Sequence, residues 1–142
     1  MKRRSADANA NPDYAYGLVI CDVNDLKYIN DRFGHDHGDH YLRKACQIIC
    51  GIYKRSPVFR TGGDEFVIII EGEDYADRLN LLSRLREISI QSAETEEGIV
   101  IAAGMAAREK GEGFHEVFHR ADKDMYAHKN QLKEKRPSHN LR

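Results

Sequence analysis

The chain has 142 residues, with 22 Lys plus Arg and 23 Asp plus Glu, so its formal net charge is −1. A charge this close to zero gives no general attraction for polyanions, so nucleic acid is not an expected partner and phosphate recognition must be local. Hydrophobic residues make up 41% and charged residues 32%, which suits one folded domain and not a disordered chain. The longest strictly aliphatic or aromatic run, residues 66–70, is far shorter than the roughly 20 residues of a membrane span. The composition therefore predicts a single soluble domain without a membrane span.

The first half of the chain begins with a polar stretch, residues 1–13, which we expect to be a flexible leader or linker stub. The apolar run over 16–21 predicts a buried strand that ends at Asp22. Glycines and polar residues over 34–38 indicate a loop. Apolar residues at helical spacing then predict a helix over 39–53.

The second half contains two short strand patterns joined by Gly-Gly-Asp-Glu at 62–65, which predicts a β-hairpin. Gly104, inside a later strand pattern, indicates a bulge or a close contact. The order of elements predicts an α/β fold (an α+β sandwich), with a mixed, mainly antiparallel sheet of about four strands flanked by helices. We expect the domain to span 14–134, followed by a polar basic tail over 135–142. The remaining elements are strands over 58–61, 66–71 and 99–105, and helices over 74–90 and from 114 to about 133.

The three cysteines are an odd number, and two of them, Cys46 and Cys50, lie four residues apart on an apolar helical face. This pattern predicts buried, reduced thiols rather than a disulfide framework. We therefore expect a cytoplasmic protein.

Three carboxylates are predicted to converge if the hairpin pairs beside the first strand: Asp22 at the end of that strand, and Asp64 and Glu65 at the hairpin tip. Carboxylate oxygens are ligands that suit Mg²⁺, whose coordination is completed by water and by substrate phosphates. The adjacent glycines Gly62 and Gly63 carry no Cβ, so a phosphate could approach the backbone closely. The residues therefore indicate a metal–nucleotide site, although such a turn is often only a turn.

Other polar residues could complete such a site. Lysines can pair with phosphates as point charges, and a carboxylate can accept hydrogen bonds from N1–H and N2–H₂ of guanine, a donor pair that adenine lacks. The candidates are Lys27, Lys129 and Lys133 for phosphates, and Asn30 and Asp39 for the base.

Three segments resemble one known family. TGGDEF, at 61–66, resembles the signature loop of the GGDEF family of diguanylate cyclases. CDVNDLKYINDRFGHDHGD, at 21–39, is similar to the family's D-x-D-x-F-K-x-x-N-D-x-x-G-H-x-x-G-D segment, and RADKDMYAHK, at 120–129, to its R-A-D-x-A-M-Y-x-A-K segment. Their order and spacing agree, and the resemblance spans about residues 16–133.

The resemblance implies a fold like that of nucleotidyl cyclases and the polymerase palm, and the synthesis of cyclic di-GMP from two GTP in bacterial signal transduction. It also implies Mg²⁺ or Mn²⁺, two ions per active site. Each domain would hold one GTP, so turnover would require a homodimer, under the control of an upstream sensor domain outside this chain. The implied roles are metal binding for Asp22, the Val23 carbonyl, Asp64 and Glu65; catalysis for Glu65, Asp64 and Lys27; guanine recognition for Asn30 and Asp39; and phosphate binding for Lys27, Lys129, Lys133, Gly62 and Gly63.

The sequence departs from the family pattern at several places. Asn24 replaces the second Asp of D-x-D, and Lys133 stands where an Arg commonly holds phosphate. The family's product-inhibition motif, R-x-x-D, reads Tyr-Lys-Arg-Ser at 53–56. We therefore predict no feedback inhibition through that site. The family's usual opening and closing segments are also absent from the ends of the chain.

Alternative functions remain open at this stage. A catalytically silent GGDEF module could bind GTP or a partner as a signalling relay, although such modules usually lose the signature carboxylates that this chain keeps. A further alternative is an enzyme that makes a mixed guanine–adenine dinucleotide. Residues 115–119 match the zinc-protease motif H-E-x-x-H, but Val117 and Phe118 belong to a core-facing stripe.

Overall fold

The structure is a computed structural model that describes residues 14–95 and 98–135. The predicted leader, 1–13, lies outside the described residues, and so does the predicted tail from residue 136 onward. Within the described residues, strands and helices follow in the order β1 (Gly17–Val23), α2 (Leu26–Phe33), α3 (His35–Ile52), β2 (Val58–Arg60), β3 (Glu65–Ile70), α4 (Gly72–Ala76), α5 (Arg78–Ser92), β4 (Ile101–Ala107) and α6 (Phe114–Lys135).

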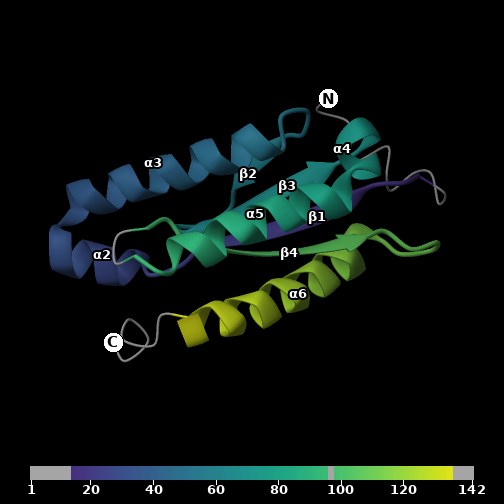
Figure 1. The fold of residues 1–142 in the computed structure, drawn as a ribbon. Helices are drawn as coiled ribbons and strands as arrows, with labels where there is room; N and C mark the ends of the chain where they lie inside the picture. The colour runs from purple at the N-terminus through teal and green to yellow at the C-terminus, as the bar shows by residue number, and fades with distance from the viewer. Residues whose placement is uncertain (1–13, 96–97, 136–142) are drawn as a thin grey trace.

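The four strands form one sheet in the order β2-β3-β1-β4, with β1 in the interior (Figure 1). All three pairings are antiparallel, and β2 and β3 form the predicted hairpin. The predicted fold class is therefore confirmed, and the described strands contain no parallel pair.

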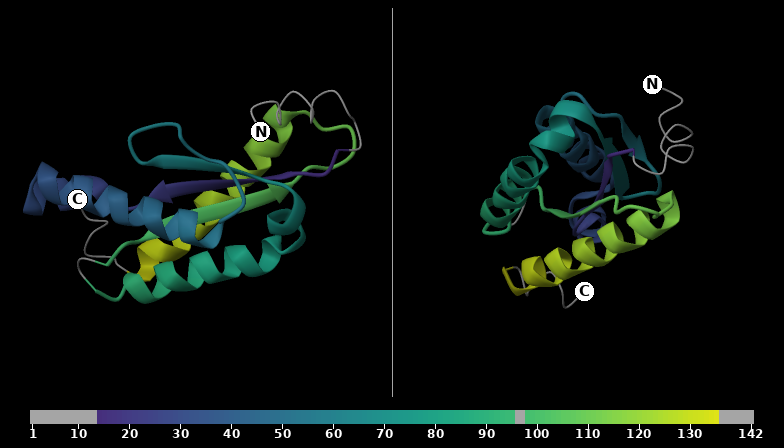
Figure 2. Two further views of the ribbon diagram at one scale, coloured as in Figure 1. Left: turned by 90° about the horizontal axis from the view of Figure 1, so that it is seen from above. Right: turned by 90° about the vertical axis from the view of Figure 1, so that its right-hand side faces the viewer.

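The sheet separates two hydrophobic layers because alternate residues of a strand face opposite sides. Val19 and Cys21 of β1 belong to the core that also contains residues of α3 and α5. Leu18 and Ile20 belong to the core that contains residues of α6. Figures 1 and 2 show α6 on the opposite side of the sheet from α3 and α5.

Two helix predictions were wrong in their bounds. Leu26–Phe33 form helix α2, which was not predicted, and α3 begins at His35, so the segment predicted as a polar loop is largely helical. Gly34, at φ 97°, is the break between the two helices. Gly38, which had the pattern of a loop glycine, is a buried residue of α3 that packs against the Asn30 side chain. The helix predicted over 74–90 is divided into α4 and α5.

Side chains, and not another strand, provide hydrogen-bond partners for backbone N–H and C=O groups on the outer edge of β4. The Ser89 hydroxyl donates to the Ile101 carbonyl oxygen at 2.7 Å and accepts from the Ile101 N–H at 3.0 Å. The Arg86 guanidinium donates to the Ala103 carbonyl oxygen through Nε at 3.1 Å and through Nη2 at 2.8 Å. These contacts supply bonds that an unpaired edge otherwise lacks.

Two residues of α6 continue this edge. Asp124 Oδ2 accepts from the Met105 N–H at 2.9 Å and pairs with Arg86 at 3.0 Å, and His128 Nδ1 accepts from the Ala103 N–H at 3.0 Å. Burial, followed by the charge of Arg86, lowers the pKa of His128 to about 4, although Asp124 opposes the shift. The imidazole is therefore neutral at pH 7.

Gly104 allows α6 to pack directly against β4. A Cβ at this residue would lie 2.0 Å from the Met125 nitrogen and 2.5 Å from the Asp124 carbonyl carbon, both backbone atoms of α6. The predicted close contact is therefore confirmed. No helix within 14–95 or 98–135 is both long and apolar enough to cross a bilayer.

Candidate active site

Two acidic residues meet at the end of β1. Asp22 lies directly opposite Glu65 in the β1–β3 pairing, and the Val23 N–H donates to the Asp64 carbonyl oxygen at 2.8 Å. Strand alternation places Asp22 and Glu65 on the face of the sheet that α6 covers. The structure thus brings together the strand end and the hairpin tip that the sequence predicts to converge.

Lys129 of α6 contacts this end of the sheet. Its Nζ donates to Asp22 Oδ2 at 2.7 Å, and the lysine and aspartate side chains are 27% and 14% exposed. Burial raises the pKa of Asp22; the Lys129 ammonium counteracts this, while Asp64 and Glu65 add to it. Burial by itself would lower the pKa of Lys129, but the hydrogen bond and charge of Asp22 raise it overall. The Lys129 ammonium therefore already stabilises the charged form of the Asp22 carboxylate.

The carboxylates fit a magnesium site in their chemistry. Residues 14–95 and 98–135 contain no preformed group of three or more His, Cys, Asp or Glu side chains able to hold a metal. Mg²⁺ does not need such a cage, because it commonly binds through one or two carboxylates, water and substrate phosphates. Asp64 and Glu65 lie close enough to Asp22 to raise its pKa by repulsion, and a divalent cation would relieve that repulsion.

The glycine turn is held from one side by its own strand. Arg60 donates through Nε to the Gly62 carbonyl oxygen at 3.1 Å and through Nη2 to the Gly63 carbonyl oxygen at 2.6 Å. The Thr61 hydroxyl donates to Glu65 Oε1 at 3.0 Å. Neither glycine has the left-handed φ that requires glycine, and a Cβ on Gly63 would meet nothing within 4 Å. The fold itself therefore does not explain the glycine at position 63, whereas close approach of a ligand would.

Asn30 and Asp39 come from two helices that pack against each other. A Cβ on Gly38 would lie 1.6 Å from Asn30 Oδ1, so the buried glycine makes room for the asparagine side chain. Asn30 Oδ1 is buried and has no hydrogen-bond partner among the described residues. Asp39, the next residue after Gly38, is exposed. The structure therefore brings the Asn30 side chain against the helical turn of α3 that carries Asp39.

Asp39 lies at one end of a pocket of about 420 Å³ between α3 and the hairpin. Two arginines of its wall, Arg43 and Arg60, were not predicted from the sequence. The place of Arg60 two residues before the glycine pair was a usable signal, and Arg43 lies one helical turn after Asp39. The other lining residues are Leu42, Cys46, Cys50, Val58 and Phe66.

The remaining predicted lysines lie on helix surfaces. Lys27 is exposed in the first turn of α2, which follows Asp25 in the left-handed conformation at φ 66°. That helix start has no side-chain cap from Asp25 and no acidic residue in its first turn, so its field favours an anion. Lys133 is exposed one turn beyond Lys129.

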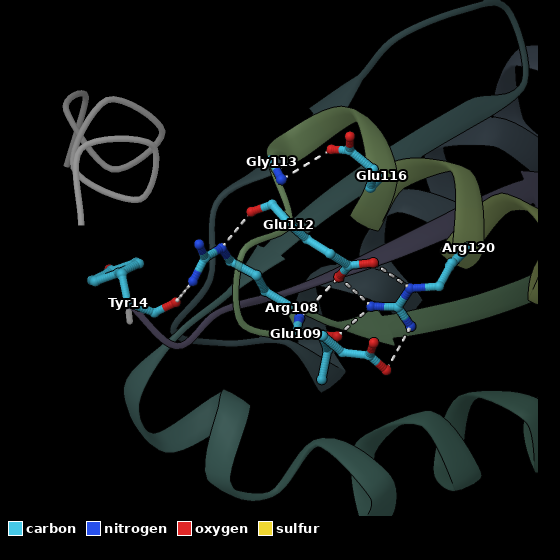
Figure 3. A network of polar contacts seen from close by, with 8 residues as sticks. Tyr14, Arg108, Glu109, Glu112, Gly113, Glu116 and Arg120 are labelled. Atoms are coloured by element: carbon cyan, nitrogen blue, oxygen red, sulfur yellow. Dashed lines mark hydrogen bonds and ion pairs between the residues drawn. The ribbon is translucent and has the colours of Figure 1, made fainter. Parts of the chain in front are cut away.

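The H-E-x-x-H segment lies at the start of α6, at the opposite end of the sheet from Asp22. Figure 3 shows Glu116 of this segment within the polar contacts around the start of the helix. Glu116 Oε1 accepts from the Gly113 N–H at 2.9 Å, so this carboxylate caps the helix. Arg120 donates to Glu112 at 2.8 and 2.6 Å and fixes the turn before the helix. No third metal ligand joins His115 and His119 within the described residues, so nothing here supports a zinc protease.

The segment at the R-x-x-D position has a structural role in this fold. Tyr53 is buried, the Ser56 hydroxyl donates to Asp74 Oδ2 at 2.6 Å, and the Arg55 N–H donates to the same oxygen at 3.1 Å. The absence of feedback inhibition through this segment stays a prediction.

Comparison with known proteins identifies one family. The family model described as diguanylate cyclase, GGDEF domain, matches residues 1–135. Diguanylate cyclase DgcS of Shewanella oneidensis is 29% identical over 110 residues, which cover 77% of this chain and 37% of that protein. Diguanylate cyclase DosC of Escherichia coli is 31% identical over 131 residues, which cover 88% of this chain and 28% of that protein. The chain thus spans about a third of the length of these curated relatives.

Solved structures show the same fold. The GGDEF domain of DgcB from Caulobacter crescentus, solved in complex with c-di-GMP, has a TM-score of 0.72 and 28% identity, and the match covers 91% of this chain and 80% of that one. The active GGEEF domain of a diguanylate cyclase from Vibrio cholerae has a TM-score of 0.73 and 25% identity, with coverage of 89% and 83%.

Proposed function

Because this chain belongs to the family of diguanylate cyclase GGDEF domains, we propose that it condenses two GTP into cyclic di-GMP with release of two pyrophosphates. The observation that carries the proposal is the placement of Asp22 opposite Glu65, beside a glycine turn whose Gly63 the fold does not require. These features unite acidic metal ligands with an open backbone, as phosphoryl transfer needs.

The residues divide the chemistry among them. Asp22, Asp64, Glu65 and the Val23 carbonyl would hold Mg²⁺ or Mn²⁺, two ions per site, which when bound supply Lewis acidity toward the α-phosphate and the attacking 3′-hydroxyl. Glu65 would accept the proton of that hydroxyl.

Substrate binding falls to residues around this acidic end. Lys27 at the start of α2, Lys129 beside Asp22 and Lys133 one turn further would bind phosphates. Asn30 of α2 and Asp39 of α3 would read the guanine edge; a carboxylate there disfavours adenine and thus a mixed dinucleotide.

Product stoichiometry implies a pair of domains. The product contains two guanylates and each domain would hold one GTP, so two copies must face each other with two-fold symmetry. Control of this pairing by a sensor domain outside the chain, and operation on the cytoplasmic GTP pool, are parts of the proposal.

The direct test uses the chain fused to a dimerising coiled coil, incubated with GTP and Mg²⁺, with cyclic di-GMP measured by chromatography. We expect product from the parent and at least about a hundredfold less from Asp22→Asn or Glu65→Gln. Lys129→Met should lower the rate strongly, whereas Lys123→Met, an exposed lysine on the same helix, should not. GTP binding without any product from the parent would instead favour the silent signalling module.

The glycine turn offers a second test with a structural control. Gly63→Ala adds a methyl group where nothing lies within 4 Å, so the free energy of unfolding should stay within about 0.5 kcal/mol of the parent. If a phosphate approaches this backbone, the same change should weaken GTP binding at least several-fold. Unchanged GTP affinity in a folded Gly63→Ala variant would show that the turn is not part of the GTP-binding site.

A further inference from the structure

Two cysteines of α3 form an accessible pair, contrary to the prediction that they are buried. Cys46 is half-buried and Cys50 is exposed, their Sγ atoms are 4.0 Å apart, and both are free thiols. They line the end of the α3–hairpin pocket away from Asp39. The sequence pattern misled because this part of the apolar stripe of α3 lies over the open pocket and not over the sheet.

The geometry of the pair does not suit a disulfide. Residues i and i+4 of a helix have Cβ atoms about 5–6 Å apart. A disulfide requires a Cβ separation of about 3.5–4.5 Å, so direct oxidation would distort α3. The thiols are therefore adjacent without being placed for direct bonding to each other.

One bridging atom fits between the two sulfurs. For a metal–thiolate bond of about 2.3 Å, sulfurs 4.0 Å apart subtend an angle of about 120° at the metal. A larger soft ion forms longer bonds and brings this angle closer to tetrahedral. The ion could thus bind without a change in the helix backbone.

We propose that Cys46 and Cys50 form a two-thiolate site for a soft, thiophilic divalent cation. Thiolates select soft metals over Mg²⁺, which separates this site from the carboxylates at Asp22. No third Cys, His, Asp or Glu completes the site within the described residues, so water would fill the remaining positions. Arg43, one turn before Cys46 in the same pocket wall, would offset part of the negative charge of the bound dithiolate.

Binding releases protons in a defined amount. Burial, and then the neighbouring Cys46, raises the pKa of Cys50, so this thiol keeps its proton near pH 7 until a metal binds. The balanced step is two thiols plus M²⁺ giving a dithiolate–metal complex and two H⁺, with no change of oxidation state. Apparent affinity should therefore increase with pH.

Cys21 serves as an internal reference. It is completely buried in β1, and burial raises the pKa of its thiol. In the native chain, a thiol reagent should titrate two cysteines quickly and the third only after denaturation. Saturation with Cd²⁺ should protect the two fast thiols.

The test uses Cd²⁺ as the probe, a phosphine reductant and excess Mg²⁺ to occupy carboxylates. The parent should show a saturable thiolate-to-cadmium charge-transfer band at one Cd²⁺ per chain. Cys46→Ser and Cys50→Ser, each confirmed as folded by circular dichroism, should lose the band. The matched variant combines Cys50→Ser with Gln47→Cys, so the chain keeps three thiols. The relocated thiol points to a different side of α3 from Cys46, and this variant should also lose the band.

Retention of stoichiometric binding by the relocated variant, or no saturable band in the parent at micromolar Cd²⁺, would overturn the proposal. The measurement reports a thiolate band and not turnover. A failure of the proposed cyclase activity would therefore leave this result unaffected.

Discussion

The contact between β4 and α6 leads to a quantitative prediction for Gly104→Ala. The new Cβ would lie 2.0 Å from the Met125 nitrogen, whereas ordinary contact begins at 3.4 Å, so the backbones must separate by about 1.4 Å. Such a shift would break the bonds that Asp124 and His128 accept from β4, whose lengths are 2.9 and 3.0 Å.

The cost follows from these two effects. Overpacking costs about 1–3 kcal/mol, and each buried N–H left without an acceptor costs about 1–3 kcal/mol. Partial relaxation relieves part of the sum, so we expect a loss of about 3–5 kcal/mol, a large fraction of the stability of a domain this size. The same displacement would also draw Lys129 away from Asp22.

Urea unfolding followed by circular dichroism measures this loss. Gly51→Ala is the matched control, because Gly51 lies in the last turn of α3 and a Cβ there would meet nothing within 4 Å. It should stabilise the chain by about 0.5–1 kcal/mol through helix propensity. If Gly104→Ala stayed within about 1 kcal/mol of the parent, the inferred backbone contact would be wrong.

Three further predictions concern buried polar groups. Ser89→Ala should cost about 2–3 kcal/mol in urea unfolding, since both backbone groups of Ile101 lose their partner. Tyr53→Phe should stabilise the chain by about 1 kcal/mol in the same assay, because the buried hydroxyl has no partner among the described residues; a comparable loss would contradict this. His128 has a folded pKa of about 4, below the unfolded value of about 6.5, so its contribution is lost as pH falls: about 2 kcal/mol between pH 7.5 and 5. His128→Asn, which keeps an acceptor but does not titrate, should remove this slope in urea midpoints measured at several pH values.

The hydrophobic pattern predicted most of the fold correctly. Short continuous apolar runs identified β1 and β3, the glycine turn identified the β2–β3 hairpin, and Gly104 indicated a close contact. The helix over 26–33 was missed because it is only eight residues long and is followed directly by Gly34. Gly38 resembled a loop signal, yet it is a helical residue whose missing Cβ accommodates Asn30. Local patterns do not distinguish a glycine needed for a turn from one needed for packing.

From the sequence alone, the motif spacing of Asp22, Asp64, Glu65 and the glycine pair indicated which side chains could do chemistry. Only the tertiary structure decided that Lys129, distant in the chain, donates to Asp22. A strand pattern specifies which side a residue faces, but the helix that covers that side is chosen by long-range packing. Long-range packing also decides the exposure of the cysteines. Their helical spacing puts Cys46 and Cys50 on one face of α3, and at this part of the helix the face lies over an open pocket.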